Sequence, residues 1–319
     1  MKLQDMILNP NDRDERKMRL RRSRNFSRMK KNIRIIFSAL LIFCSVISSA
    51  QHPAYSDSLH KSRWNIGITY WNALSYDGYV RVREWEWTGD KLSLADDLGM
   101  DGLRSAGIFV SYRVKKNNVF IISFERFSFS GNAVPPNNIW YNATHLKGTD
   151  GLSINKSWLA RGEFRFEKSY HPENRIHAVS ITGLLCDGLK FYIDGTVLPD
   201  TYMNEPHEGW ADQALPFPFL GLRLNAKLCA HSSLSLETAG THVPLFKSFY
   251  TEGGNMYLSY SAADVSINYF LTKGKFRISG SYLYRMIEIY GDSREDTNDF
   301  FMTASGIRFT AGYYFKQIF

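Results

Sequence analysis

Apolar and polar residues alternate with a period of two over most of the chain, the pattern of β-strands whose two faces differ. The end of the chain shows it best: from 263 to 271 the odd positions are apolar, while Asp264, Ser266 and Asn268 are polar. Segments 276–286 and 307–315 continue the alternation. Two-faced strands of about ten residues predict an all-β, antiparallel transmembrane barrel, because every backbone group must be paired within hydrocarbon.

Similar segments upstream bring the expected total to about ten strands. The expected strands are 64–73, 104–113, 119–130, 158–167, 176–194, 220–228, a weaker one at 232–243, 263–271, 276–286 and 307–315. The expected outward loops are 79–103, 131–153, 195–216 and 244–254. Within 176–194 the apolar face is interrupted at Asp187-Gly188, which predicts a β-bulge.

Segment 79–95 carries charges on both faces. A strand there would place Glu84 and Glu86 in lipid, which would cost kilocalories per mole. We therefore expect a hairpin outside the membrane, turning at 88–91. If the segment spans instead, the barrel has twelve strands.

Positive charge is concentrated at the start of the chain. Residues 1–50 hold 12 Lys/Arg and 4 Asp/Glu, whereas 51–319 carry 27 residues of each sign. Because the body is formally neutral, no nucleic-acid partner is expected. Within the extension 1–50, a basic stretch, an apolar run too short to span a membrane and a small-residue site predict a cleaved signal peptide over 29–50. Met29 as the initiator and an extended leader remain alternatives, and the barrel domain is expected over 51–319.

Nine charged residues fall on the polar faces and are expected to point into the barrel. They are Arg161, Glu163, Arg165, Glu167, Arg223, Asp264, Arg277, Arg285 and Arg308. A ten-stranded barrel is barely wider than an eight-stranded one, which its own side chains fill. We therefore expect an ion-pair network that plugs the lumen, and a selective pore lined by the same charges is the alternative.

Evidence for catalysis is weak, and we assign no catalytic residue. The weak candidates are His207 and Asp212 in one loop and His242 at a strand end, since a histidine beside a carboxylate can activate water. No second histidine stands at a ligand spacing from His207, and no phosphate loop or nucleotide fingerprint occurs, so neither a metal nor a cofactor is expected. Cys186 lies mid-strand and Cys229 near a turn, so free thiols are expected.

The secretory leader, the paired strands with short inner turns and the closing segment 309–319 together resemble small outer-membrane β-barrel proteins of Gram-negative bacteria, with the architecture of OmpA- and OmpX-like barrels. The leader is most similar to those of Bacteroidetes. The resemblance covers 51–319 as architecture, and only the closing segment has a recognised signature, from which Gln317 departs. It implies an outer-membrane location, contact with lipid and lipopolysaccharide, and recognition by the barrel-assembly machinery. The residues implied in that recognition are Phe309, Tyr313, Phe315 and Phe319.

The resemblance does not imply one activity, because such proteins include structural barrels, channels, adhesins, proteases and lipid A-modifying enzymes. The first hypothesis is a monomeric, non-enzymatic envelope protein with a structural, adhesive or narrow-channel role. The second is an outer-membrane hydrolase, a lipid A deacylase or omptin-like protease, with a loop-borne His/carboxylate site. A soluble β-sandwich or lipocalin-like barrel is a third possibility, which the arginines on the inner faces disfavour.

Overall fold

The computed structural model describes residues 62–84, 89–142, 144–199, 210–211, 216–247, 257–293 and 296–316. The chain divides into two compact units, 1–52 and 53–319, and all described residues belong to the second. The expected signal peptide therefore lies outside the described residues.

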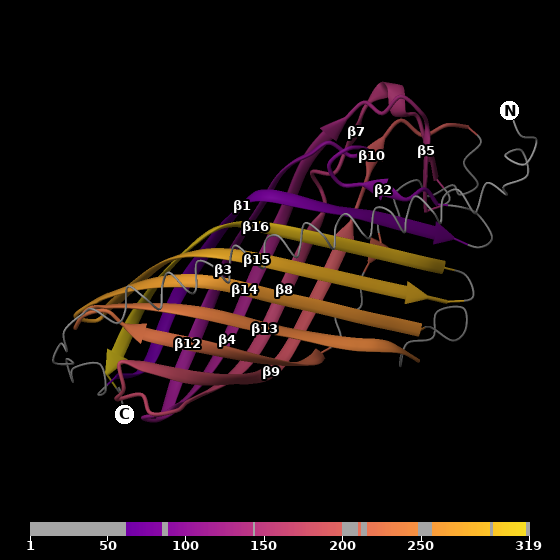
Figure 1. Ribbon diagram of the computed structural model, residues 1–319. Coiled ribbons are helices and arrows are strands. Elements are labelled where there is room, and N and C mark those ends of the chain that lie inside the picture. The colour runs from indigo at the N-terminus through magenta and orange to yellow at the C-terminus, as the bar shows by residue number, and fades with distance from the viewer. Residues whose placement is uncertain are drawn as a thin grey trace, which may run out of the picture. The chain divides into compact units, whose positions relative to one another are not determined.

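Ten long antiparallel strands form one closed sheet (Figure 1). They are β1 (Ser62–Glu84), β3 (Met100–Lys115), β4 (Asn118–Ala133), β8 (Trp158–Ser169), β9 (Ile176–Phe191), β12 (Pro216–Lys227), β13 (Ser232–Lys247), β14 (Tyr257–Lys273), β15 (Phe276–Asp292) and β16 (Asp296–Lys316). The ring closes because β1 pairs with both β3 and β16, and β8 joins β4 to β9. The predicted ten-stranded antiparallel barrel is confirmed, and the described residues leave no place for twelve strands.

The two ends of the barrel differ in how the strands are joined. Connections 116–117, 170–175, 228–231 and 274–275 are short and lie at one end, which we call the turn end. The first residue of β1 pairs there with the last residue of β16. The opposite end, which we call the loop end, carries most of the longer connections.

Short elements organise the loop end (Figure 1). They are β2 (Leu92–Ser93), β5 (Ile139–Tyr141), β6 (Thr144–Leu146), the 3-10 turn η3 (Gly148–Asp150), β7 (Leu152–Ser153), β10 (Asp194–Gly195) and β11 (Trp210–Ala211). β5 and β6 form a hairpin, while β7 pairs with β4 and β10. Segment 131–153 is therefore more ordered than the irregular loop expected there. Within the described residues, no helix is long and apolar enough to cross a membrane.

The hairpin expected over 79–95 is present, because β2 pairs with β1, with Tyr79 opposite Ser93 and Val80 opposite Leu92. The expectation that this segment is separate from the barrel wall is wrong, because β1 continues through its first half and pairs with β16 throughout. A register shift at residues 73–75 changes the phase of the alternation. Val80 and Val82 consequently point inward and are buried, and Arg81 takes the opposite face. Residues 79–83 of β1 therefore have an apolar inner face and a polar outer face. Such an outer face suits a part of the barrel that lies in water and not in lipid.

The bulge predicted at Asp187-Gly188 is also wrong. β9 pairs with β8 in unbroken register across this point. Asp187 keeps the inward parity of Leu185 and Leu189, and all three are buried. The interruption in the apolar face is therefore a charged residue placed inside the barrel, where Arg161 pairs with it.

The two faces of the wall exchange character between the turn end and the loop end. In β4, Ile122 and Phe124 are exposed on the outer face near the turn end. Two residues further on, Arg126 is exposed, while Phe127 and Phe129 are fully or almost fully buried inside. The same strand is thus apolar outside near the turns and apolar inside near the loops.

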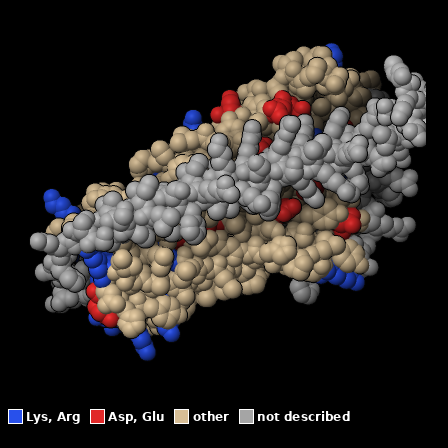
Figure 2. All heavy atoms as spheres, viewed as in Figure 1, with Lys and Arg blue, Asp and Glu red and all other residues tan. Residues whose placement is uncertain are grey.

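Other strands repeat this exchange. Exposed apolar residues near the turn end form a belt, which we define by Trp64, Ile66, Ile68, Tyr70, Ile108, Ile122, Phe124, Leu220, Leu222, Leu271, Ile278, Ile307 and Phe309. Buried apolar residues near the loop end form a core that includes Val80, Leu94, Leu98, Leu103, Phe127, Phe129, Leu159, Phe191, Ile287, Ile289, Phe300 and Met302. Most of the wall visible between the two ends in Figure 2 is uncharged.

Candidate functional site: the charged interior

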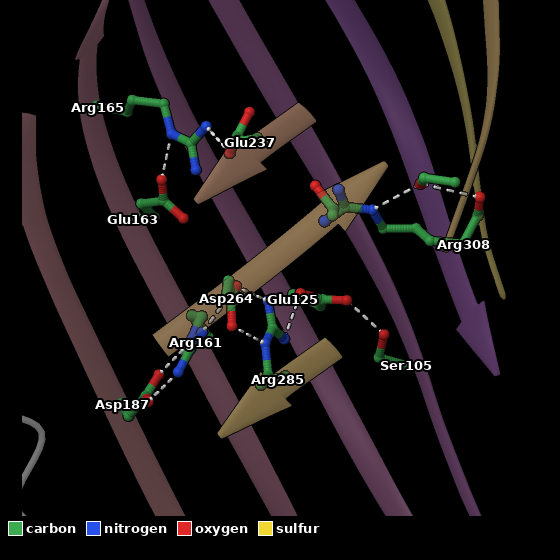
Figure 3. A network of polar contacts seen from close by, with 12 residues as sticks. Ser105, Glu125, Arg161, Glu163, Arg165, Asp187, Glu237, Asp264, Arg285 and Arg308 are labelled. Carbon is green, nitrogen blue, oxygen red and sulfur yellow. Dashed lines mark hydrogen bonds and ion pairs between the residues drawn. The ribbon is translucent and has the colours of Figure 1, made fainter. Parts of the chain in front are cut away.

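The structure places all nine charged residues expected in the lumen inside the barrel. Arg161 is buried, and the other eight line a cavity of about 420 Å³ that lies toward the turn end. Most of their carboxylates and guanidinium groups gather in two clusters (Figure 3). The central charged cluster comprises Glu125, Arg161, Asp187, Asp264 and Arg285. The turn-side charged cluster comprises Glu163, Arg165, Glu167, Arg223 and Glu237.

Arg161 and Asp187 form the best-buried ion pair of the central charged cluster. Arg161 Nε donates to Asp187 Oδ1 at 2.7 Å, and Nη2 donates to Oδ2 at 2.6 Å. The Tyr260 hydroxyl also donates to Asp187. The side chains of Arg161 and Asp187 are 4% and 0% exposed, so each relies on the other in place of water.

Arg285 extends this cluster across the lumen. It donates to both oxygens of Asp264, at 2.8 and 2.7 Å, and to Glu125 Oε2 at 3.1 Å. Glu125 also accepts a hydrogen bond from the Ser105 hydroxyl. Asp264 in turn accepts a longer contact of 3.4 Å from Arg161. The cluster therefore ties strands from opposite sides of the ring, with three carboxylates to two guanidinium groups.

The turn-side charged cluster repeats the same ratio. Arg165 Nε donates to Glu163 at 2.5 Å, and its Nη1 donates to Glu237 at 2.7 Å. Arg223 bridges Glu237 at 3.2 Å and Glu167 at 3.0 Å. Arg165 and Glu167 on β8 pair with Glu237 on β13 and Arg223 on β12, so the cluster braces β8 against β12 and β13.

Two further arginines line the cavity without a carboxylate within ion-pair distance in the described residues. Arg308 contacts Ser281 Oγ and Asn268 Oδ1, both at 3.4 Å, and it acts electrostatically on Glu237 and Asp264. It therefore supplies positive charge to both clusters. Arg277 donates to the Tyr314 hydroxyl at 3.3 Å.

The sequence analysis missed three residues of these clusters, Glu125, Asp187 and Glu237, which pair with predicted arginines. It also missed Tyr260, whose hydroxyl donates to Asp187. Strand parity alone would have placed Glu125 and Asp187 inside, since each is in phase with inward neighbours. Their partners could not be found from the sequence, because Arg285 and Glu125 are separated by 160 residues.

The cavity meets the apolar core at Leu283. Its deepest charged lining residues are Glu125, Asp264 and Arg285, whereas Phe127 and Phe300 of the core lie beyond its lining. In the described part of the chain, the lumen is thus a vestibule that is closed by the clusters and then by packed apolar side chains.

The weak catalytic candidates do not come together. His207 and Asp212 lie outside the described residues. His242 is exposed on the outer face of β13, and its Nδ1 lies 2.9 Å from Ser261 Oγ on β14. Glu288 on β15 is opposite Ser261 in the register. Among the described residues, no three His, Cys, Asp or Glu side chains are grouped to hold a metal ion.

The remaining predicted residues lie on the wall. Phe309 is exposed in the belt, and Tyr313 and Phe315 are half-buried beside it, with ring centroids 4.8 Å apart. Phe319 lies outside the described residues. Neither Cys186 nor Cys229 is in a disulfide, as expected.

No protein-family model matches the sequence, and no curated protein matches it. Among solved structures, the chain is similar to the outer membrane protease OmpT from Escherichia coli, with 6% identity, a TM-score of 0.45, and coverage of 84% of this chain and 100% of that one. The translocator domain of the autotransporter NalP from Neisseria meningitidis has 12% identity, a TM-score of 0.38, and coverage of 91% and 98%. The attachment invasion locus protein Ail of Yersinia pestis has 11% identity, a TM-score of 0.24, and coverage of 77% and 99%. Because these scores lie below 0.5, the barrel assignment rests on the strand pairing described above.

Proposed function

We propose that this chain is a monomeric outer-membrane barrel of a Gram-negative bacterium with a sealed lumen, serving a structural or adhesive role. A membrane location is supported by the apolar belt, because a closed barrel with an apolar outer band meets the requirement that lipid leaves no backbone group unpaired. Under this proposal the signal peptide directs export, the barrel-assembly machinery inserts the chain, and the belt contacts lipid and lipopolysaccharide.

The closed interior is the observation that carries the proposal. The ion pairs of both clusters and the apolar core beyond them occupy the space that a conducting pore would need. A packed interior of this kind is known from small barrels that are filled by their own side chains. Of the roles expected from the sequence, the structural and adhesive ones therefore have more support than the narrow channel.

The loop end supports the adhesive role. Its short strands pack apolar residues beneath them, including Ile139, Leu146 and Ile154. The Tyr141 hydroxyl donates to the backbone oxygen of Phe191 at 2.8 Å, which ties the β5–β6 hairpin to the barrel. Such a packed layer presents a fixed surface to the outside, which suits contact with a partner.

Planar-bilayer recording of the purified full-length protein tests the proposal. We expect no steady conductance steps, with a general porin as the positive control in the same membranes. Heat-modifiability on a gel, compared between boiled and unboiled outer-membrane fractions, verifies that the recorded protein is a folded barrel. Regular conductance steps from the folded protein would contradict the sealed lumen, and soluble protein without a mobility shift would contradict the membrane location.

A second candidate, a surface hydrolase acting on lipid A, is favoured by one contact. His242 Nδ1 lies at hydrogen-bond distance from Ser261 Oγ on the outer face, the pairing that activates a serine nucleophile. Release of fatty acid from lipid A by the wild type, abolished by both His242→Ala and Ser261→Ala, would establish this activity. Equal results from wild type and both variants would leave the non-enzymatic role.

A further inference from the structure

We propose that the turn-end vestibule of the barrel binds a small multivalent anion that carries carboxylate or phosphate groups. This inference goes beyond the proposed function, since a sealed barrel needs no ligand. Three observations support it: the excess of basic residues on the cavity wall, the hydrogen-bond donors that Arg277 keeps available, and the volume of the cavity.

Positive charge exceeds negative charge on the cavity wall. Nine Lys or Arg residues line the cavity, against five Asp or Glu residues. All five carboxylates belong to the two charged clusters, where arginines already pair with them. The excess therefore lies toward the mouth, where the lining bases are Arg63, Arg113, Lys116, Lys227 and Arg277.

The mouth bases come from four places around the ring, namely β1, the end of β3 with the β3–β4 connection, β12 and β15, so they surround the opening from several sides. A carboxylate at the rim, Glu173, lies near Lys116 and offsets part of the charge. Several Lys and Arg side chains are visible at this end of the barrel, at the lower left of Figure 2. A cleft with charges of one sign and low-dielectric walls concentrates counter-ions, which favours capture of an anion from solution.

Arg277 is held in place and keeps donors available. Its guanidinium lies 3.9 Å from the centre of the Phe270 ring, and one nitrogen donates to the Tyr314 hydroxyl. A guanidinium has five N–H donors in a rigid fork suited to carboxylate and phosphate oxygens. Since one hydrogen bond is formed within the described residues, most of these donors remain for a ligand. A stacked and fixed arginine also loses little freedom on binding.

The cavity has room for such a ligand. Its volume of about 420 Å³ lies in the range of roughly 300–1,000 Å³ typical of small-molecule sites. The space opens inside the barrel at the turn end, so the ligand arrives through water, while the outer belt faces away from it. A soluble anion therefore fits the site better than the headgroup of a lipid in the surrounding bilayer.

Isothermal titration of the detergent-solubilised full-length protein with citrate, pyrophosphate and glucose tests the proposal at low ionic strength. We expect saturable binding of citrate or pyrophosphate, none of glucose, and weaker binding as salt is raised, because salt screens charge. The variant Arg63→Gln/Arg277→Gln removes two mouth charges that lie outside both clusters. We expect its affinity to fall about tenfold or more, since a charge-assisted hydrogen bond contributes at least that factor.

The matched control is Arg104→Gln/Arg126→Gln, which removes the same charge from exposed outer-face positions. It should bind the anions as the wild type does. All variants are checked for heat-modifiability, so that a misfolded protein is not scored. Equal affinity of the mouth variant and the wild type would overturn the proposal, as would the absence of anion binding by folded wild type. Neither result depends on conductance, so failure here is distinct from failure of the sealed-lumen proposal.

Discussion

Replacing Arg161 with methionine should destabilise the barrel strongly, because it leaves Asp187 without its ion-pair partner. The Asp187 side chain is 0% exposed, and two of its three hydrogen bonds come from Arg161. Methionine keeps much of the length and apolar volume of the arginine stem, so the change isolates the loss of the charge. Removal of one partner from a buried pair costs about 3–5 kcal/mol.

The exposed pair Lys156–Asp194 provides the comparison that makes this magnitude informative. Its nitrogen and oxygen lie 2.8 Å apart, similar to the 2.6 Å of the buried pair, but its side chains are 64% and 43% exposed. Exposed pairs contribute about 0–1 kcal/mol. Lys156→Met should therefore cost much less stability than Arg161→Met, although the contact distances are nearly the same.

A double variant, Arg161→Met/Asp187→Leu, separates the cost of leaving the Asp187 carboxylate buried and unpaired from the loss of the ion pair itself. Removing both partners should recover most of the stability, because no buried carboxylate remains uncompensated. The assay is reversible unfolding in urea with detergent or lipid vesicles, followed by tryptophan fluorescence and by the folded band on gels. If Arg161→Met and Lys156→Met lose the same stability within about 0.5 kcal/mol, burial does not control the strength of these ion pairs. That result would refute the reasoning.

Two further predictions concern close packing and topology. Gly67→Ala should destabilise the barrel by about 1–3 kcal/mol, because a Cβ there would lie 2.3 Å from the backbone oxygen of Ala311. Gly280→Ala is the control: a Cβ there has nothing within 4 Å, so this variant should unfold at the same urea concentration as the wild type. The reverse order would refute the packing argument. Cys229 lies in a turn at the turn end, where a hydrogen bond with the Ser232 hydroxyl lowers the pKa of its thiol and makes it reactive at neutral pH. If the turn end faces the periplasm, a bulky maleimide should label Cys229 only after the outer membrane is permeabilised. Labelling of intact cells would show the opposite orientation.

The strands and their parity could be predicted because a period of two is visible without knowledge of the partner strands. The inward direction of Arg161, Glu167 and Arg285 follows from that parity. The shift at residues 73–75 could not be predicted in this way, because it arises where β1 meets β16, more than two hundred residues later.

The exchange of faces was hidden for a different physical reason. Alternation shows that two faces differ but does not show which face points inward. Phe124 on the outer face and Phe127 in the core therefore give the same apolar signal, although their positions differ in parity. The pairing of Arg285 with Glu125 was hidden because it crosses the lumen between strands that are not neighbours. The fold could thus be predicted from the sequence more fully than the interior contacts on which the proposed function rests.

In the membrane location proposed above, the exchange of faces along β4 would also fix how deep the barrel sits in the bilayer. If the molecule rose by one pair of residues, Ile122 and its neighbours in the belt would enter water; if it sank by as much, Arg126 would enter hydrocarbon. A cation in the middle of the bilayer costs about 2–4 kcal/mol, and one near the interface costs less. Displacement in either direction is therefore opposed, so the belt and the outer-face charges beside it would hold the loop end at a constant distance from the bilayer.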